Sequence, residues 1–190
     1  EKKIQEASVP VDALYLAFHI PERLHKDYYA IDLLSDILCN GSSSRLYRRL
    51  LKEQQLFTSI DCYVTGSIDP GLIVIEGKPS EGVTLEQAEN AIWEELNKIK
   101  SELVEAEELE KVKNKVESTM VFSETNVLNK AMNLAFYELL GDVELTNQEM
   151  RHYEKVKVKD IKRVAQTFLT EENCCELYYK AKKGEVELVC

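Results

Sequence analysis

The sequence is poor in glycine, proline and histidine, and it has no long apolar run. It contains 7 Gly, 4 Pro and 3 His among 190 residues. So few glycines and prolines exclude a low-complexity chain and a long flexible linker. No apolar run approaches the ~20 residues that a membrane-spanning helix needs. The length suits one domain, and we predict a single domain over residues 1–190.

Positive charge is also scarce. The chain carries 34 acidic and 24 basic residues, which gives a formal net charge of −10. Proteins that bind nucleic acid neutralise phosphates with Lys and Arg, and no basic stripe is present here. An anionic membrane surface is disfavoured for the same reason. We therefore expect neither nucleic acid nor a membrane as a partner.

Paired cysteine motifs are missing as well. The sequence has no CxxC motif, and its odd number of cysteines cannot pair completely within one chain. The five are Cys39, Cys62, Cys174, Cys175 and Cys190. We interpret them as reduced thiols and expect a reducing, cytoplasmic compartment. No signal peptide precedes the first predicted strand, and the chain begins with Glu rather than Met, so we interpret its start as internal to a longer polypeptide.

Hydrophobic periodicity predicts an α+β fold. Alternating apolar residues predict strands, and apolar residues spaced three and four apart predict helices. The predicted strands are 12–20, 58–65, 71–77 and 174–180, with the middle pair joined as a hairpin. The predicted helices are 26–39, 85–99, 109–120, 128–139 and 161–168; Gly41 and Gly141 are expected to end the first and fourth, and Thr84 to cap the second. We predict a mainly antiparallel sheet with helices packed on one face.

The histidines do not form a zinc-binding pattern. The nearest match begins at His19 as H-x-x-E, but the second histidine that zinc would need is replaced by Arg23. Arginine is a permanent cation and cannot coordinate a metal. We interpret His25 and His152 as solvated. We therefore predict no catalytic residue, no metal ligand and no cofactor in this chain.

Two other polar segments have structural interpretations. Ser42–Ser44 lies in no G-x-S-x-G elbow and has no nearby histidine, so we predict an N-cap for a short helix that runs through about Lys52. The segment Glu81–Glu110 holds ten Glu. These alternate with the apolar stripe of the predicted helices, which favours a solvated face. The alternative is a cavity wall that attracts cationic ligands.

The most specific pattern lies in residues 27–57, around a turn between two predicted helices. Gly41, Ser43, Ser44, Arg45 and Leu46 form what we call the corner motif. It resembles the C-terminal domain of the pitrilysin/insulinase-type zinc metallopeptidases, the inverzincins. The order of predicted elements agrees with that family along almost the whole chain. The departures are Cys39-Asn40 within the corner, and Gln54-Gln55 where the family has a basic residue and a glycine.

The resemblance implies a non-catalytic half of a peptidase. The family's metal motif, H-x-x-E-H with a distal Glu, belongs to an N-terminal domain, so zinc is expected there and not in this chain. The implied parent hydrolyses peptide bonds with a zinc-bound water. This domain would be a wall of the peptide chamber and a domain or subunit interface. The implied partners are the N-terminal metal-binding domain of the same polypeptide, a peptide substrate, and a second subunit in a homodimer or pair.

No substrate-contact residue can be transferred from the family. Some members place an Arg and a Tyr of a non-catalytic domain against the substrate. This chain has no Arg between Arg49 and Arg151 and no Tyr between Tyr63 and Tyr137.

Two alternatives stay open. The first is a metal-free structural or partner subunit of the same family, which acts as an interaction scaffold. The second is an unrelated α+β ligand-binding domain in which Ser43–Leu46 matches by coincidence.

Overall fold

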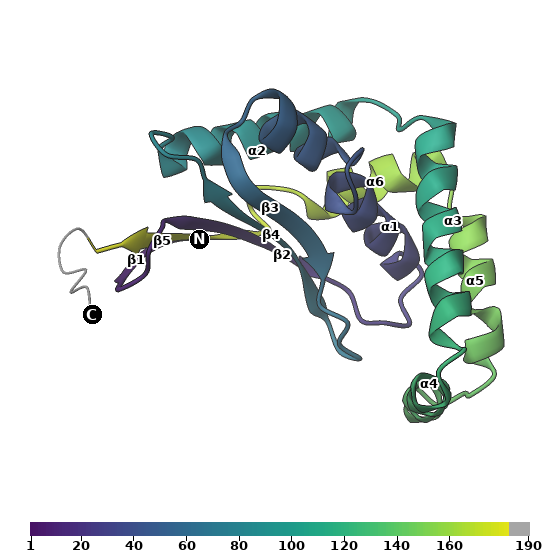
Figure 1. The fold of residues 1–190 in the computed structure, drawn as a ribbon. Coiled ribbons are helices and arrows are strands. Elements are labelled where there is room, and N and C mark those ends of the chain that lie inside the picture. The colour runs from purple at the N-terminus through teal and green to yellow at the C-terminus, as the bar shows by residue number, and fades with distance from the viewer. Residues whose placement is uncertain (183–190) are drawn as a thin grey trace.

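The computed structural model describes residues 1–182, in which one five-stranded sheet is covered by helices on one face (Figure 1). In chain order the elements are β1 (Lys2–Ala7), β2 (Ala13–Ile20), α1 (Tyr28–Cys39), the π-helix η1 (Tyr47–Glu53), β3 (Phe57–Val64), β4 (Gly71–Pro79), α2 (Leu85–Ser101), α3 (Ala106–Ser123), α4 (Val127–Leu139), α5 (Leu145–Lys155), α6 (Val158–Phe168) and β5 (Cys174–Ala181). The predicted α+β class is confirmed.

The strand order is β1-β5-β2-β4-β3. β1 runs parallel to β5, and every other neighbouring pair is antiparallel. β3 and β4 form the predicted hairpin, in which Val64 pairs with Ile73. Because β5 inserts between β1 and β2, the last strand of the described residues pairs with the first two strands.

Alternation along β2 shows why the core lies on one face of the sheet. Leu14, Leu16 and Phe18 are fully buried, whereas Tyr15 is half-buried and His19 is exposed. Successive side chains of a strand point to opposite faces, so a single strand separates a core face from an uncovered face. α1, α2 and α6 contact the core face.

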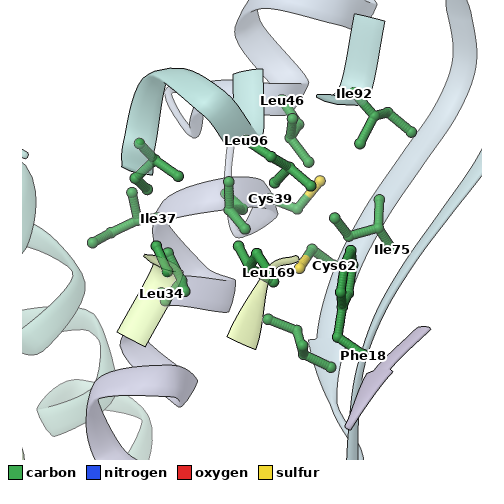
Figure 2. Packing of buried hydrophobic residues seen from close by; sticks show 14 of the residues in the cluster. Phe18, Leu34, Ile37, Cys39, Leu46, Cys62, Ile75, Ile92, Leu96 and Leu169 are labelled. Carbon is green, nitrogen blue, oxygen red and sulfur yellow. The ribbon is translucent and has the colours of Figure 1, made fainter. Parts of the chain in front are cut away.

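The buried cluster joins the core face of the sheet to these helices. Figure 2 shows the thiols of Cys39 and Cys62 inside it, among the apolar side chains of α1, α2 and the sheet. Burial raises the pKa of the Cys39 thiol to about 12 and raises that of Cys62 as well. The four cysteines of the described part form no disulfide, and Cys190 lies outside the described residues.

Three of the predicted helix ends are confirmed. Gly41 and Gly141 follow α1 and α4 with φ angles of +109° and +101°, a backbone region that favours glycine. Thr84 caps α2 through a capping box with Gln87. The short helix predicted after Ser42–Ser44 is present: helical residues begin at Arg45, directly after Ser44, and η1 ends at Glu53. The predicted side-chain cap is absent, because no side chain caps η1.

Two elements have no counterpart among the predictions. β1 is an exposed edge strand whose residues show no apolar alternation. It forms because it pairs with β5, a partner more than 170 residues away. α5 has a buried Tyr153 but few other apolar residues, so no long apolar stripe marks it in the sequence.

α4 is correctly predicted as a helix, but its apolar stripe is not in the core. Only Tyr137 of this helix is buried. Leu128, Met132 and Leu139 are 65%, 61% and 71% exposed. In Figure 1, α4 lies at the far end of α3, away from the sheet.

Candidate functional site

The corner motif is a tight turn held by its own hydrogen bonds. Ser44 is buried and its hydroxyl donates to the carbonyl oxygen of Gly41 at 2.7 Å. This explains why Ser44 does not cap η1: its hydroxyl bonds backwards along the chain instead. Leu46 is fully buried in the core cluster. The Ser43 hydroxyl accepts a hydrogen bond from Lys111, so neither serine hydroxyl is hydrogen-bonded to a histidine within residues 1–182.

The corner is attached to α3 by polar side chains. Arg45 donates two hydrogen bonds to the carboxylate of Glu108, from Nε at 2.9 Å and from Nη2 at 2.8 Å. Lys111 donates to the hydroxyl of Ser43. Further along α3, the ammonium group of Lys115 donates to the side chain of Asn40. The three α3 residues recur at helical spacing, so one face of α3 carries all these contacts.

η1 ends with a backbone conformation that is unusual for its residue. Gln55 has φ +54°, in the left-handed region. The amide of Leu56 donates to the carbonyl of Leu50 at 2.9 Å, which closes the helix end as glycine-terminated helices do. The family glycine that Gln54-Gln55 replaces would suit this conformation.

An open cavity of about 640 Å³ lies beside the corner. Five cationic and five acidic side chains line it together with Ser43: Arg45, Arg48, Arg49, Lys98, Lys111, Glu95, Glu102, Glu105, Glu107 and Glu108. Its charges are balanced, so it offers no strong field for an ion of either sign. This does not support the alternative of a wall that attracts cations.

The interpretation of the acidic segment as a solvated face is wrong for part of its residues. Glu95 is 4% exposed, and its carboxylate lies 2.5 Å from Lys98 Nζ and 3.6 Å from Arg49 Nε. Glu108 is engaged by Arg45. The helical period could not reveal these ion pairs because their partners come from other elements or from the next helical turn.

The candidate zinc residues are not assembled. His19 is exposed on β2, whereas Arg23 is buried and forms an ion pair with Glu149. Within residues 1–182, no group of three or more His, Cys, Asp or Glu side chains is arranged to hold a metal ion. In the same residues, no helix is both long enough and apolar enough to cross a bilayer.

The interpretation of His25 and His152 as simply solvated is wrong. Both are half-buried. His25 Nδ1 accepts a hydrogen bond from the backbone amide of Asp27 at 3.2 Å. The ring of His152 stacks on Tyr29 with a centroid distance of 4.8 Å, and its burial lowers its pKa. Both rings therefore have packing roles at the start of α1.

A buried polar cluster between α1 and α5 was not predicted. The hydroxyl of Tyr153 donates to the carboxylate of Asp32 at 2.6 Å, and burial raises the pKa of that carboxyl. Arg23 stacks over the ring of Tyr28 at 4.3 Å beside its ion pair with Glu149. Glu149 and Tyr153 belong to α5, which was not predicted, and the helical period of residues 26–39 does not reveal that Asp32 meets Tyr153.

Within residues 1–182, the face of the sheet away from the helices is largely uncovered. It presents Tyr15 of β2, Tyr63 of β3 and Tyr179 of β5, none of which is fully buried. A hollow of about 250 Å³ near the ends of β3 and β4 is lined by Tyr15, Asp61 and other residues of these strands. Aromatic and charged side chains together make this face suited to contact with another polypeptide.

Known proteins match both this sequence and this fold. The family model described as "Peptidase M16 inactive domain" matches residues 1–116. The zinc protease PqqE of Helicobacter pylori is 23% identical over 177 residues, which cover 93% of this chain and 40% of that protein. The solved structure of a protease from Helicobacter pylori has a TM-score of 0.88 at 21% identity, over 94% of this chain and 44% of that one.

A third match covers a single domain. The inactive peptidase domain of a proposed zinc protease from Bordetella parapertussis has a TM-score of 0.84 at 22% identity, over 97% of this chain and 99% of that one. This chain thus spans less than half of the curated relatives that it matches. Because the family model covers more than half of the chain, it excludes the alternative of an unrelated ligand-binding domain. The chain belongs to the peptidase M16 inactive-domain family.

Proposed function

We propose that this chain is the non-catalytic half of a zinc peptidase whose zinc-binding half lies elsewhere in the same polypeptide. Two observations support this: the family model is that of an inactive domain, and the curated relatives named as zinc proteases are more than twice as long. In such a protein the companion half supplies zinc and the metal-bound water that attacks the peptide bond. A homodimer, or a pair of related subunits, would enclose the substrate.

We also propose a role in that protein for the uncovered face of the sheet. α1, α2 and α6 cover only the opposite face. Tyr15, Tyr63 and Tyr179 stand on the uncovered face beside charged groups such as Asp61. Such a surface can pack against apolar and polar parts of an extended peptide. We therefore propose that it is one wall of the peptide chamber.

Zinc content and peptide cleavage test the proposal. Residues 1–190 and the complete polypeptide are each assayed for bound zinc and for cleavage of an unstructured fluorogenic peptide. We expect about one zinc and chelator-sensitive cleavage for the complete polypeptide, and neither for residues 1–190 alone. Stoichiometric zinc with cleavage by residues 1–190 would contradict the proposal. A complete polypeptide without zinc or cleavage would make the protein an interaction scaffold. Light scattering on the same samples tests the homodimer.

A charge placed on the uncovered face tests the chamber wall. Tyr15→Asp in the complete polypeptide should raise KM for the peptide several-fold and leave the zinc content unchanged. Asn97→Asp adds the same charge to an exposed position of α2, in the helical layer, and should change neither quantity. Equal KM values for the two variants would remove the uncovered face from substrate binding. Circular dichroism confirms that both variants fold.

A further inference from the structure

Several exposed apolar residues lie close together in sequence at the end of α3 and in α4. Six belong to the end of α3 and to α4, and each is more than 60% exposed: Val121, Phe122, Val127, Leu128, Met132 and Leu139. We call these six residues the α4 patch. Isolated apolar residues are common on protein surfaces, but a group of six on adjoining helices is not.

The helical geometry shows that this exposure is not accidental. Leu128, Met132 and Leu139 recur at spacings of four and seven, which places them on one side of α4. Tyr137, the only buried residue of the helix, lies on another side, where it lines a hollow together with residues of α3 and α5. α4 therefore has two apolar sides, and within residues 1–182 only the side that carries Tyr137 is covered.

The size of the patch matches that of a stable interface. The six side chains together expose on the order of 800 Å², which is about what one partner contributes to a standard protein–protein interface. The largest apolar patch of an ordinary monomer is roughly 300–600 Å². An exposed apolar area of this size is typical of a surface that binds a partner.

From these observations we infer that the α4 patch is the surface on which the companion half of the same polypeptide docks. The inference rests on the proposed function, because it requires that a companion half exists. The curated relatives matched along 90% or more of this chain extend far beyond it, and the chain spans only 40% and 42% of their lengths. A half joined by a covalent linker is present at high effective concentration, so it covers the patch before a free partner can.

The charges on α4 argue against a membrane as the occupant. Amphipathic helices that lie on membranes carry many Lys and Arg residues on their polar side. α4 carries one of each sign, Lys130 and Glu138. Its polar side is nearly neutral and the whole chain has a net charge of −10, so an anionic bilayer offers it little attraction.

Cysteine labelling tests the inference. Leu128→Cys places a thiol in the α4 patch, and Lys130→Cys places a matched thiol roughly 160° away around the helix. Both positions are exposed in residues 1–182. Maleimide labelling at each site is followed by mass spectrometry, in residues 1–190 alone and in the complete polypeptide.

We expect both thiols to react at similar rates in residues 1–190 alone. In the complete polypeptide, labelling of the Leu128→Cys variant should slow at least tenfold and that of Lys130→Cys less than threefold. Equal rates for Leu128→Cys in the two proteins would overturn the inference. So would protection of that thiol in residues 1–190 that grows with protein concentration, because the occupant would then be a second copy.

Cleavage by the complete polypeptide separates the two proposals. If Leu128→Cys is protected but the complete polypeptide neither binds zinc nor cleaves peptide, the docking surface stands and the peptidase proposal fails. If the polypeptide cleaves peptide and the thiol stays reactive, the reverse holds.

Discussion

At the scale of single residues, the corner motif matters through its contacts rather than through reactive chemistry. Arg45 is the only one of its five residues with a charged side chain, and that side chain reaches across to α3. Ser43 and Ser44 are held by hydrogen bonds, and Leu46 by the core. We propose that the motif fastens the α1–η1 connection to α3.

Arg45→Ala should destabilise the fold. It removes two charge-assisted hydrogen bonds to Glu108 and should lower the free energy of unfolding by about 1.5–3 kcal/mol, since both side chains are mostly buried. Arg48→Ala is the control. Its ion pair with Glu53 is about half exposed, so we expect a loss below about 0.5 kcal/mol. Urea unfolding measures both, and equal losses would refute a fastening role for Arg45.

Gln55→Gly should stabilise the fold, although glycine usually weakens one. The left-handed conformation at φ +54° costs a non-glycine residue about 1–2 kcal/mol, and Gln55→Gly removes this cost. Glycine also makes the unfolded chain more flexible, which offsets roughly half of that gain. We expect a gain of about 0.5–1 kcal/mol. Gln54→Gly, at φ −89°, should instead lose about 1 kcal/mol. Thermal unfolding of the Gln55→Gly and Gln54→Gly variants tests this prediction. It would be contradicted if both variants lost stability by similar amounts.

The cysteines should differ in reactivity. At pH 8, iodoacetamide should label exposed Cys175 and spare Cys39, Cys62 and Cys174 until the chain unfolds, with Cys190→Ser as the background. Burial raises the pKa of Cys39 and Cys174 to about 12. Each of these thiols loses its proton at a lower pH in the unfolded chain than in the folded chain. The free energy of unfolding should therefore be constant below about pH 8.5 and should fall as the pH rises toward 12. Rapid labelling of Cys62 in the native protein would show that the core is open.

At the scale of elements, ion pairs between helices supplement the apolar core. Asp27, just before α1, accepts two hydrogen bonds from Arg163 of α6, at 2.7 and 3.1 Å. These bonds hold the pKa of the Asp27 carboxyl below its ordinary value against the opposing effect of burial. The pair therefore joins α6 to the start of α1 whenever Asp27 is ionised.

Asp27→Asn should show this dependence on pH. A lowered pKa means that the stabilisation is present above about pH 3.9, the pKa of an unfolded Asp, and is lost as the pH falls through the folded value. We expect Asp27→Asn to cost about 1 kcal/mol at pH 7, a modest value because Arg163 is half exposed. The cost should be smaller near pH 2 than at pH 7, because the carboxyl gains protons as the pH falls. Urea unfolding at both pH values measures the loss of unfolding free energy caused by Asp27→Asn. A loss that does not change with pH would show that the ion pair is not its source.

At the scale of the whole molecule, stability should be uneven. α1 is buried on several sides, whereas α4 buries only Tyr137. Helices with few buried contacts open locally at a small fraction of the global unfolding free energy. The end of α3 and α4 should therefore be the least protected helical region of residues 1–182.

Hydrogen exchange followed by mass spectrometry measures this gradient. In residues 1–190 alone, amides of α4 should exchange at least roughly tenfold faster than those of α1. Similar protection of α1 and α4 would mean that α4 is already packed, and would weaken the assignment of its patch to an absent partner.

The sequence by itself determined the class, the order of most elements and several of their ends. Strand alternation and helical spacing are local periodicities, and Gly41, Gly141 and Thr84 act through their own backbone or through neighbours within three residues. The corner motif, with its layout, pointed to the family that the comparisons show.

Only the tertiary structure decided which polar groups are paired and which apolar stripe stays uncovered. Arg45 meets Glu108 and Tyr153 meets Asp32 across more than 60 residues, and no local pattern records such partners. β1 becomes a strand only because β5 lies beside it. The stripe of α4 has the period of a core helix, but whether a stripe is buried depends on what packs against it. Among residues 1–182 nothing covers the Leu128 side of α4, because α1, α2 and α6 pack on the sheet and α3 and α5 pack against α1.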